Sequence, residues 1–228
     1  MKTHSSWIPA ALAVSLLSAC GGDGSDPTSA QEYAVSVAER LLLTDGGSWT
    51  VNGSDPTAGA FTATFSFTPR PDAAFPVTGA VLSLSQEDYT LVQAGVTTDV
   101  GGPTFYFDKA SLSFLGADNG DGTCAVATAS TAAPASAAVG ANGPLMTRSE
   151  LNLCSSGAGV VGATKVSWSL ERDTGIALLC WNSTVTDATG ATVETDSDCV
   201  EVAPDGTLGT KARLSIAALG HTITARNF

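Results

Sequence analysis

The chain has 228 residues and a formal net charge of -12, with 43% hydrophobic and only 14% charged residues. This length suits one sizeable domain or two small ones, and the hydrophobic content is typical of a folded protein. The acidic charge argues against nucleic-acid binding and against electrostatic docking on anionic lipid headgroups.

The first 19 residues are arranged like an export signal. Lys2 gives a short, positively charged start, and an apolar run from Trp7 to Leu17 follows it. That run is too short to span a bilayer, which takes ~20 apolar residues. It fits the hydrophobic segment of a signal peptide over residues 1–19, and it ends in the sequence Leu17-Ser18-Ala19-Cys20.

This ending resembles the lipobox of bacterial lipoproteins, in which an aliphatic residue and two small residues precede an invariant cysteine. The resemblance covers only the first twenty or so residues. It implies cleavage after Ala19 by signal peptidase II and acylation of Cys20, so that the protein reaches the membrane through covalent lipid. Gly21, where Asp would signal retention at the inner membrane, implies the outer membrane of a Gram-negative bacterium. Residues 20–31 are rich in turn-forming residues and predict a flexible tether.

The remainder, residues 32–228, predicts a mainly β domain. Apolar residues at helical spacing favour a short helix over Glu32–Leu43. From Ser48 onward the period becomes two, most clearly where Phe61 to Phe67 alternate with Thr and Ser. Weaker alternation recurs in residues 77–85, 104–108, 111–115, 166–170, 176–186, 191–202 and 208–217. The pattern predicts an antiparallel β-sandwich or a partly closed barrel with a short N-terminal helix. If the domain divides, the Gly-rich stretch 116–122 separates sub-lobes 32–116 and 122–228.

Four cysteines follow Cys20, namely Cys124, Cys154, Cys180 and Cys199. None forms a C-x-x-C pair, which argues against a zinc ribbon and a thioredoxin-type redox motif. An even number in an oxidising compartment predicts two disulfides, for which three connectivities are possible.

Hairpin geometry favours one of these connectivities, because opposite residues in an antiparallel hairpin have a constant sum of residue numbers. For Cys180 and Cys199 the centre lies within the turn-forming residues 187–190, so the two can face each other directly. For Cys124 and Cys154 the centre falls in an expected loop. We therefore favour the pairs Cys124–Cys154 and Cys180–Cys199.

The sequence contains few signals of catalysis. His221 is the one histidine after the predicted cleavage site, and it follows a glycine in an expected turn. The patterns G-x-S-x-G and H-E-x-x-H do not occur. A catalytic thiol is disfavoured because every cysteine has a predicted partner or a lipid. We therefore assign no catalytic residue and expect a solvated His221.

The segment Asp118-Asn119-Gly120-Asp121-Gly122 is rich in oxygen ligands and partly matches a calcium loop. Ala117 stands where an EF-hand has its first acidic ligand, however, and Thr128 stands where it has its last glutamate. A tight turn is the favoured interpretation. Calcium bound by Asp118, Asn119 and Asp121 is the alternative.

Two further groups have a structural and a functional interpretation. Glu194, Asp196 and Asp198 share one strand face, which predicts the solvated side of an edge strand, with a divalent-cation site as the alternative. Trp49 and Trp181 are expected to be buried, with a stacking platform for sugars as the alternative.

These observations favour a membrane-anchored lipoprotein of the cell envelope that has a non-catalytic binding or structural role. Its partner would be a protein or glycan of the envelope. One alternative is an envelope glycan hydrolase that uses paired carboxylates, which leave no short motif. Another is a calcium-dependent ligand-binding module built around Asp118 and Asp121.

Overall fold

The structure is a computed structural model that describes residues 31–55, 59–218 and 221–228. The predicted signal peptide, Cys20 and all of the predicted tether except Gln31 lie outside the described residues. Within the described ranges, no helix combines the length and the apolar character that crossing a membrane would require.

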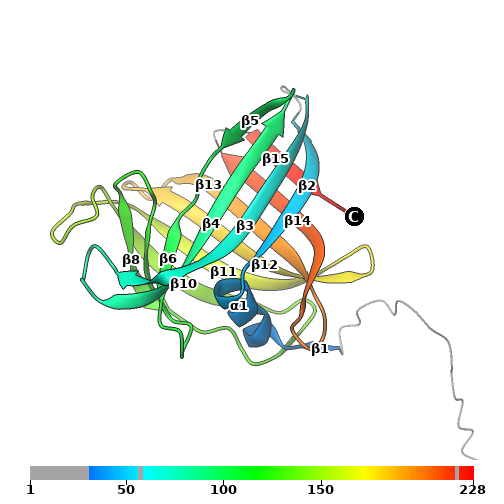
Figure 1. Cartoon of the computed structure of the whole chain (residues 1–228), viewed down its shortest axis with the longest axis horizontal. Coiled ribbons are helices and arrows are strands. Elements are labelled where there is room, and N and C mark those ends of the chain that lie inside the picture. The colour runs from blue at the N-terminus through cyan, green and yellow to red at the C-terminus, as the bar shows by residue number, and fades with distance from the viewer. Residues whose placement is uncertain (1–30, 56–58, 219–220) are drawn as a thin grey trace, which may run out of the picture.

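Twelve strands of the described chain form a closed antiparallel barrel, in which each strand pairs with its neighbours in sequence order (Figure 1). These strands are β2 (Gly47–Asp55), β3 (Gly59–Ala74), β4 (Val81–Gln93), β6 (Thr104–Phe107), β7 (Phe114–Asp118), β8 (Cys124–Ser130), β10 (Asn142–Leu151), β11 (Val160–Asp173), β12 (Ile176–Asp187), β13 (Thr192–Val202), β14 (Leu208–Ala218) and β15 (His221–Arg226). Pairing of β15 with β2 completes the ring. The predicted mainly β fold is confirmed.

Two short elements lie outside the ring. Strand β5 (Val96–Asp99) pairs with β4, and their hairpin rises above the rim of the barrel (Figure 1). Strand β1 (Glu32–Tyr33) pairs with β9 (Ala137–Ala138) in a separate small sheet. The Gly-rich stretch 116–122 comprises the end of β7 and the turn to β8, which is the neighbour of β7 in the barrel wall.

The alternation in β3 shows how the sequence builds this wall. Phe61, Ala63, Phe65 and Phe67 are buried and belong to the main hydrophobic core, whereas the Thr and Ser residues between them are only partly covered. Side chains of a strand point alternately to opposite faces, so one row fills the barrel interior. Full burial of a phenylalanine side chain contributes roughly 1.5 to 3 kcal/mol.

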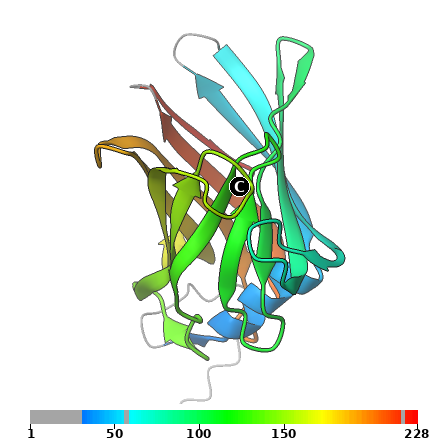
Figure 2. The same cartoon turned by 90° about the vertical axis from the view of Figure 1, so that its left-hand side faces the viewer.

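Helix α1 (Val35–Thr44) lies across one end of the barrel (Figures 1 and 2). It begins three residues later than expected, because Glu32 and Tyr33 pair with β9 instead of forming helical turns. Leu42 and Leu43 of the helix are buried in the main core. The helix therefore covers the interior at this end.

Loops at the same end hold α1 in place through backbone carbonyls. The Ala34 N–H donates to Pro204 O at 3.0 Å, and the Ser36 N–H donates to Pro134 O at 3.1 Å. Arg40 Nη1 donates to Lys109 O at 3.0 Å. Since these three acceptors come from three separate loops, the helix is fixed to the barrel end on several sides.

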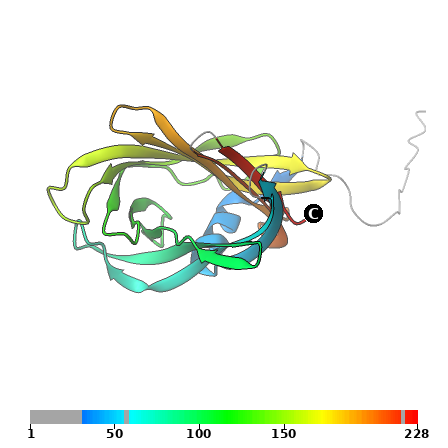
Figure 3. The same ribbon diagram turned by 90° about the horizontal axis from the view of Figure 1, so that it is seen from above.

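An aromatic layer fills the barrel above the helix. The Trp181 ring from β12 packs edge-on against Phe67, Phe114 and Phe105, with ring centroids 5.3, 5.7 and 6.0 Å apart. These side chains come from β3, β6, β7 and β12. In the view from above, the strands of the barrel wall form a closed ring (Figure 3). The interior is therefore filled by side chains between α1 and this layer.

Both predicted disulfides are present. Cys124 is bonded to Cys154 with a Cα separation of 4.8 Å, and Cys180 is bonded to Cys199 with a Cα separation of 4.0 Å. Cys180 and Cys199 are direct register partners in the β12–β13 hairpin, as the position of the turn predicts. They lie on the outer face of the wall, because the adjacent Trp181 faces the interior.

Candidate functional site

A cavity of about 370 Å³ occupies the part of the barrel interior that α1 and the aromatic layer leave unfilled. Its walls are mostly apolar and come from strands on all sides, including Phe61, Leu91, Val166, Val185, Ile216 and Ile223. Residues Val100 to Pro103, which follow β5, complete the lining at the rim, where Val100 is exposed. The cavity is thus closed towards α1 and reaches solvent near the β4–β5 hairpin.

Three acidic residues of β13 face this cavity. Asp198, Asp196 and Glu194 are register partners of Trp181, Ser183 and Val185 on β12, and all six residues line the cavity. The expectation of a solvated edge strand is wrong for this row. Strand β13 lies between β12 and β14, and Asp198 is only 7% exposed.

A tyrosine from the opposite side of the barrel connects two of the carboxyl groups. The Tyr89 hydroxyl on β4 lies 2.7 Å from Asp198 Oδ2 and 3.0 Å from Glu87 Oε1. A hydroxyl has one proton, so it can donate to only one of these oxygens and must accept from the other. We assign the shorter contact to donation from Tyr89 to ionised Asp198, and the longer one to donation from protonated Glu87 to Tyr89.

The surroundings of these groups favour their protonated forms. Burial, followed by the Asp196 charge, raises the pKa of Asp198 to about 7. Burial, followed by the Asp198 charge, raises the pKa of Glu87 well above its ordinary value. The same two causes raise the pKa of the Tyr89 hydroxyl, so it stays protonated at neutral pH. Both carboxyl groups are therefore protonated more readily than exposed acids are.

One arginine lines the cavity beside these acids. Arg148 Nε on β10 donates to Glu150 Oε1 at 2.9 Å, and the guanidinium carbon lies 5.7 Å from the centre of the Phe105 ring. Among the described residues that line the cavity, two buried side-chain atoms have no hydrogen-bond partner, Arg148 Nη1 and Asp198 Oδ1. Because buried polar atoms are normally paired, these two mark places where a ligand could bind.

The two tryptophans of interest are buried, as expected. Trp49 is 5% and Trp181 is 6% exposed, so neither offers an open platform for a sugar ring. Trp49 Nε1 donates to Gly209 O at 2.9 Å, which satisfies its polar atom. Trp181 has a second role that the sequence did not suggest, since it forms part of the cavity lining.

The candidate calcium ligands are held in a turn beside the first disulfide. Asp118 Oδ1 accepts from the Gly120 N–H, Asp121 Oδ1 accepts from the Thr123 N–H, and Asn119 Nδ2 donates to Thr123 Oγ1. These hydrogen bonds are typical of a tight turn, which is the interpretation that the sequence analysis favoured.

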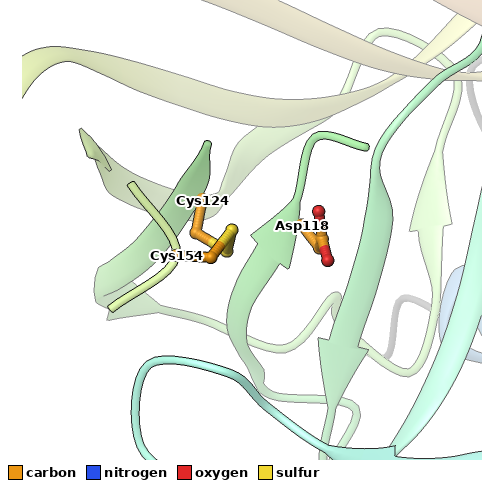
Figure 4. A group of neighbouring side chains, drawn as sticks. All are labelled: Asp118, Cys124 and Cys154. Atoms are coloured by element: carbon orange, nitrogen blue, oxygen red, sulfur yellow. A yellow bond between two sulfur atoms is a disulfide. The ribbon is translucent and has the colours of Figure 1, made fainter. Parts of the chain in front are cut away.

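A possible metal group at this turn also has a structural explanation. Asp118 lies close to Cys124 and Cys154, with ligand atoms within 4.8 Å of one another (Figure 4). The two sulfurs are bonded to each other and therefore provide no thiolate. Asp118 is left as a single carboxylate ligand in this group, to which Asp121 does not belong.

His221 is the first residue of β15, and its backbone pairs with Ala218. Its side chain lies outside what the structure describes. The cavity is therefore the site that the described residues support best, because it combines apolar walls with a buried carboxylate oxygen, Asp198 Oδ1, that has no hydrogen-bond partner in the described chain. Comparisons with protein-family models, with curated proteins and with solved structures gave no match.

Proposed function

We propose that this chain is an exported, lipid-anchored binding protein that holds a small amphiphilic molecule in its barrel cavity. The cavity itself is the observation that supports this role. Small-molecule sites are typically concave, about 300 to 1,000 Å³ in volume and mostly apolar, with a few polar groups that orient the ligand. The volume of about 370 Å³, the apolar wall and the buried Asp198 and Arg148 fit this description.

The expected location supports the same role. The lipobox resemblance at Leu17 to Cys20 implies a covalent anchor, and two disulfides are typical of proteins outside the cytoplasm. An anchored barrel would stay close to a membrane surface, in the cell envelope and by expectation at the outer membrane. Molecules with an apolar body concentrate at such surfaces, so the anchor and the cavity serve one purpose.

The carboxyl pair also favours a second candidate function, a glycan hydrolase. In the hydrogen-bond assignment above, Glu87 is protonated and Asp198 is ionised, which is the division of roles that an acid and a base require. The cavity is less suitable for this function, because its apolar walls offer few partners for sugar hydroxyls and its closed end cannot pass a polymer. We therefore rank binding first and assign no catalytic residue.

Fluorescence titration with N-phenyl-1-naphthylamine tests the binding role. We expect saturable binding to the wild-type protein and its loss in Ile216→Trp, because Ile216 lines the cavity and a larger ring would fill it. Ser215→Trp is the matched control, since Ser215 is the adjacent residue on the outer face of β14. Equal binding to all three proteins would refute the cavity as the site.

An assay with peptidoglycan fragments tests the second candidate. If the wild-type protein released new reducing ends and Asp198→Asn did not, hydrolysis would be favoured over the binding role. We expect no release from either protein.

A further inference from the structure

We propose that the cavity selects an amphiphile with one positive charge, and that Asp198 binds its ammonium group. This inference rests on the proposed binding function and specifies its ligand class.

The charges that line the cavity do not balance. Among the described residues, four carboxyl groups and one guanidinium line it, from Glu87, Glu194, Asp196, Asp198 and Arg148. With Glu87 protonated, three of these carboxyl groups can carry a negative charge. The Arg148 charge is already matched by Glu150, which lies next to it outside the lining. A cationic ligand would therefore reduce the like-charge repulsion in the cavity, whereas an anionic ligand would increase it.

Asp198 is the described carboxylate of the cavity lining that has a buried oxygen without a hydrogen-bond partner. Its Oδ2 accepts from Tyr89, while its Oδ1 is buried and lacks a partner in the described chain. By contrast, Asp196 Oδ2 accepts a hydrogen bond from Ser183 at 2.7 Å. An ammonium N–H would supply both the missing donor and the counter-charge, so it would remove the cost of leaving Oδ1 unpaired.

The titratable groups that act on Asp198 are Glu87 and Tyr89 on β4 and Asp196 on β13. Arg148 on β10 lines the same cavity. The register partners of Asp198 on β12 and β14 are Trp181 and Leu214, which carry no charge. The ligand body would therefore lie against apolar side chains while its charged end lies at Asp198.

This geometry predicts that binding depends on pH. An ammonium group binds the ionised form of Asp198 and disfavours the protonated form. For an amine that stays protonated throughout, affinity should therefore rise as the pH increases from 6 to 8, through the pKa of Asp198 at about 7. Binding near pH 6 should also release protons, which calorimetry in two buffers of different ionisation enthalpy would detect.

Isothermal titration calorimetry with three matched probes tests the inference: 1-naphthylmethylamine, 1-naphthalenemethanol and 1-naphthoic acid. We expect the wild-type protein at pH 8 to bind the amine most tightly. Loss of a charged hydrogen bond in Asp198→Asn should weaken amine binding roughly 10- to 100-fold and leave alcohol binding nearly unchanged.

Asp88→Asn is the control, because it makes the same chemical change on β4 at a residue that does not line the cavity. Asp198→Asn should fold, since the amide oxygen can still accept from Tyr89. Thermal melting of both variants checks this point, and the pH dependence of the wild-type protein gives a readout that needs no variant.

The outcomes separate the two proposals. If the alcohol or the acid binds as tightly as the amine, or if Asp198→Asn keeps its amine affinity, the charge selection is wrong while the binding function stands. If the wild-type protein binds none of the three probes at millimolar concentration, the binding function fails, and the inference falls with it.

Discussion

Tyr89 and Asp198 are 109 residues apart in the chain, yet the Tyr89 hydroxyl lies 2.7 Å from Asp198 Oδ2 across the barrel interior. This contact joins β4 to β13, which are not neighbours in the sheet. The contact therefore connects two sides of the barrel wall at the cavity. Backbone hydrogen bonds cannot make this connection, because they join only neighbouring strands.

Removal of this hydroxyl in Tyr89→Phe should destabilise the protein in a pH-dependent way. At pH 8 the ionised Asp198 would lose its donor, at a cost of about 1 to 3 kcal/mol in the free energy of unfolding. At pH 5 the protonated carboxyl needs that donor less, so the loss should be smaller. Urea denaturation at both pH values measures the difference, and an equal loss at pH 5 and pH 8 would contradict the assigned proton positions.

Glu39 of α1 should make the protein less stable above neutral pH. Glu39 is only 1% exposed, and its burial raises the pKa of the carboxyl from 4.5 to about 7. The nearby Ala133 backbone and the Arg40 charge lower this pKa, but they offset the effect of burial only in part. The folded protein thus holds this proton more tightly than the unfolded chain does. The resulting stability is present below pH ~4.5 and is lost as the pH rises to about 7.

Glu39→Gln removes this dependence. We expect a gain at pH 8 on the order of 3 kcal/mol and almost none at pH 4, because each pKa unit corresponds to about 1.4 kcal/mol. Glu32→Gln makes the same change at an exposed residue and should have little effect. Thermal melting across this pH range compares the variants, and a gain at pH 4 as large as that at pH 8 would rule out the titration of Glu39 as its cause.

The two disulfides should contribute similar stability but differ in their effect on the cavity. Replacement of either pair by alanine should cost about 2 to 4 kcal/mol, which guanidinium denaturation measures. The Cys124–Cys154 bond joins the first residue of β8 to the β10–β11 loop, so its loss should also weaken binding of N-phenyl-1-naphthylamine. Unchanged binding without it would show that this part of the rim does not shape the cavity.

Cys20→Ser should release the protein from the membrane. The lipobox resemblance places the acyl chains on this sulfur, and burial of acyl chains provides ~0.8 kcal/mol for each CH₂ group. Partition in Triton X-114 should therefore move from the detergent phase to the aqueous phase. A wild-type product that mass spectrometry shows to be unmodified at Cys20, with its leader attached, would remove the anchor from the proposed function.

The strand pattern and the disulfides could be predicted because both depend on local sequence. The alternation from Phe61 to Phe67 marks which residues share a face, and the turn at 187–190 fixes the Cys180–Cys199 register. Closure of the ring could not be predicted in this way, because it depends on pairing between β2 and β15, which are distant in the chain.

The acidic cavity was missed for a related reason. Alternation shows that Glu194, Asp196 and Asp198 share a face, but it does not show which face is inside. A row of acidic residues on the strand face opposite a cysteine usually faces solvent. In β13 the acidic row instead faces the barrel interior, and Cys199 lies on the outer face. Tyr89 gave no signal either, because Gln86 and Asp88 on the other face of β4 are as polar as Glu87 on the face that Tyr89 shares.

Ala225 and Arg226 pair with Gly53 and Asn52, so the last strand of the barrel seals it against the first long one. Without that strand the sheet would keep two unpaired edges, which are templates for self-association. Translation products that stop short of β15 should therefore accumulate as insoluble aggregates rather than as smaller working proteins. Under the proposed export, the chain would likewise need protection from aggregation until β15 has been delivered.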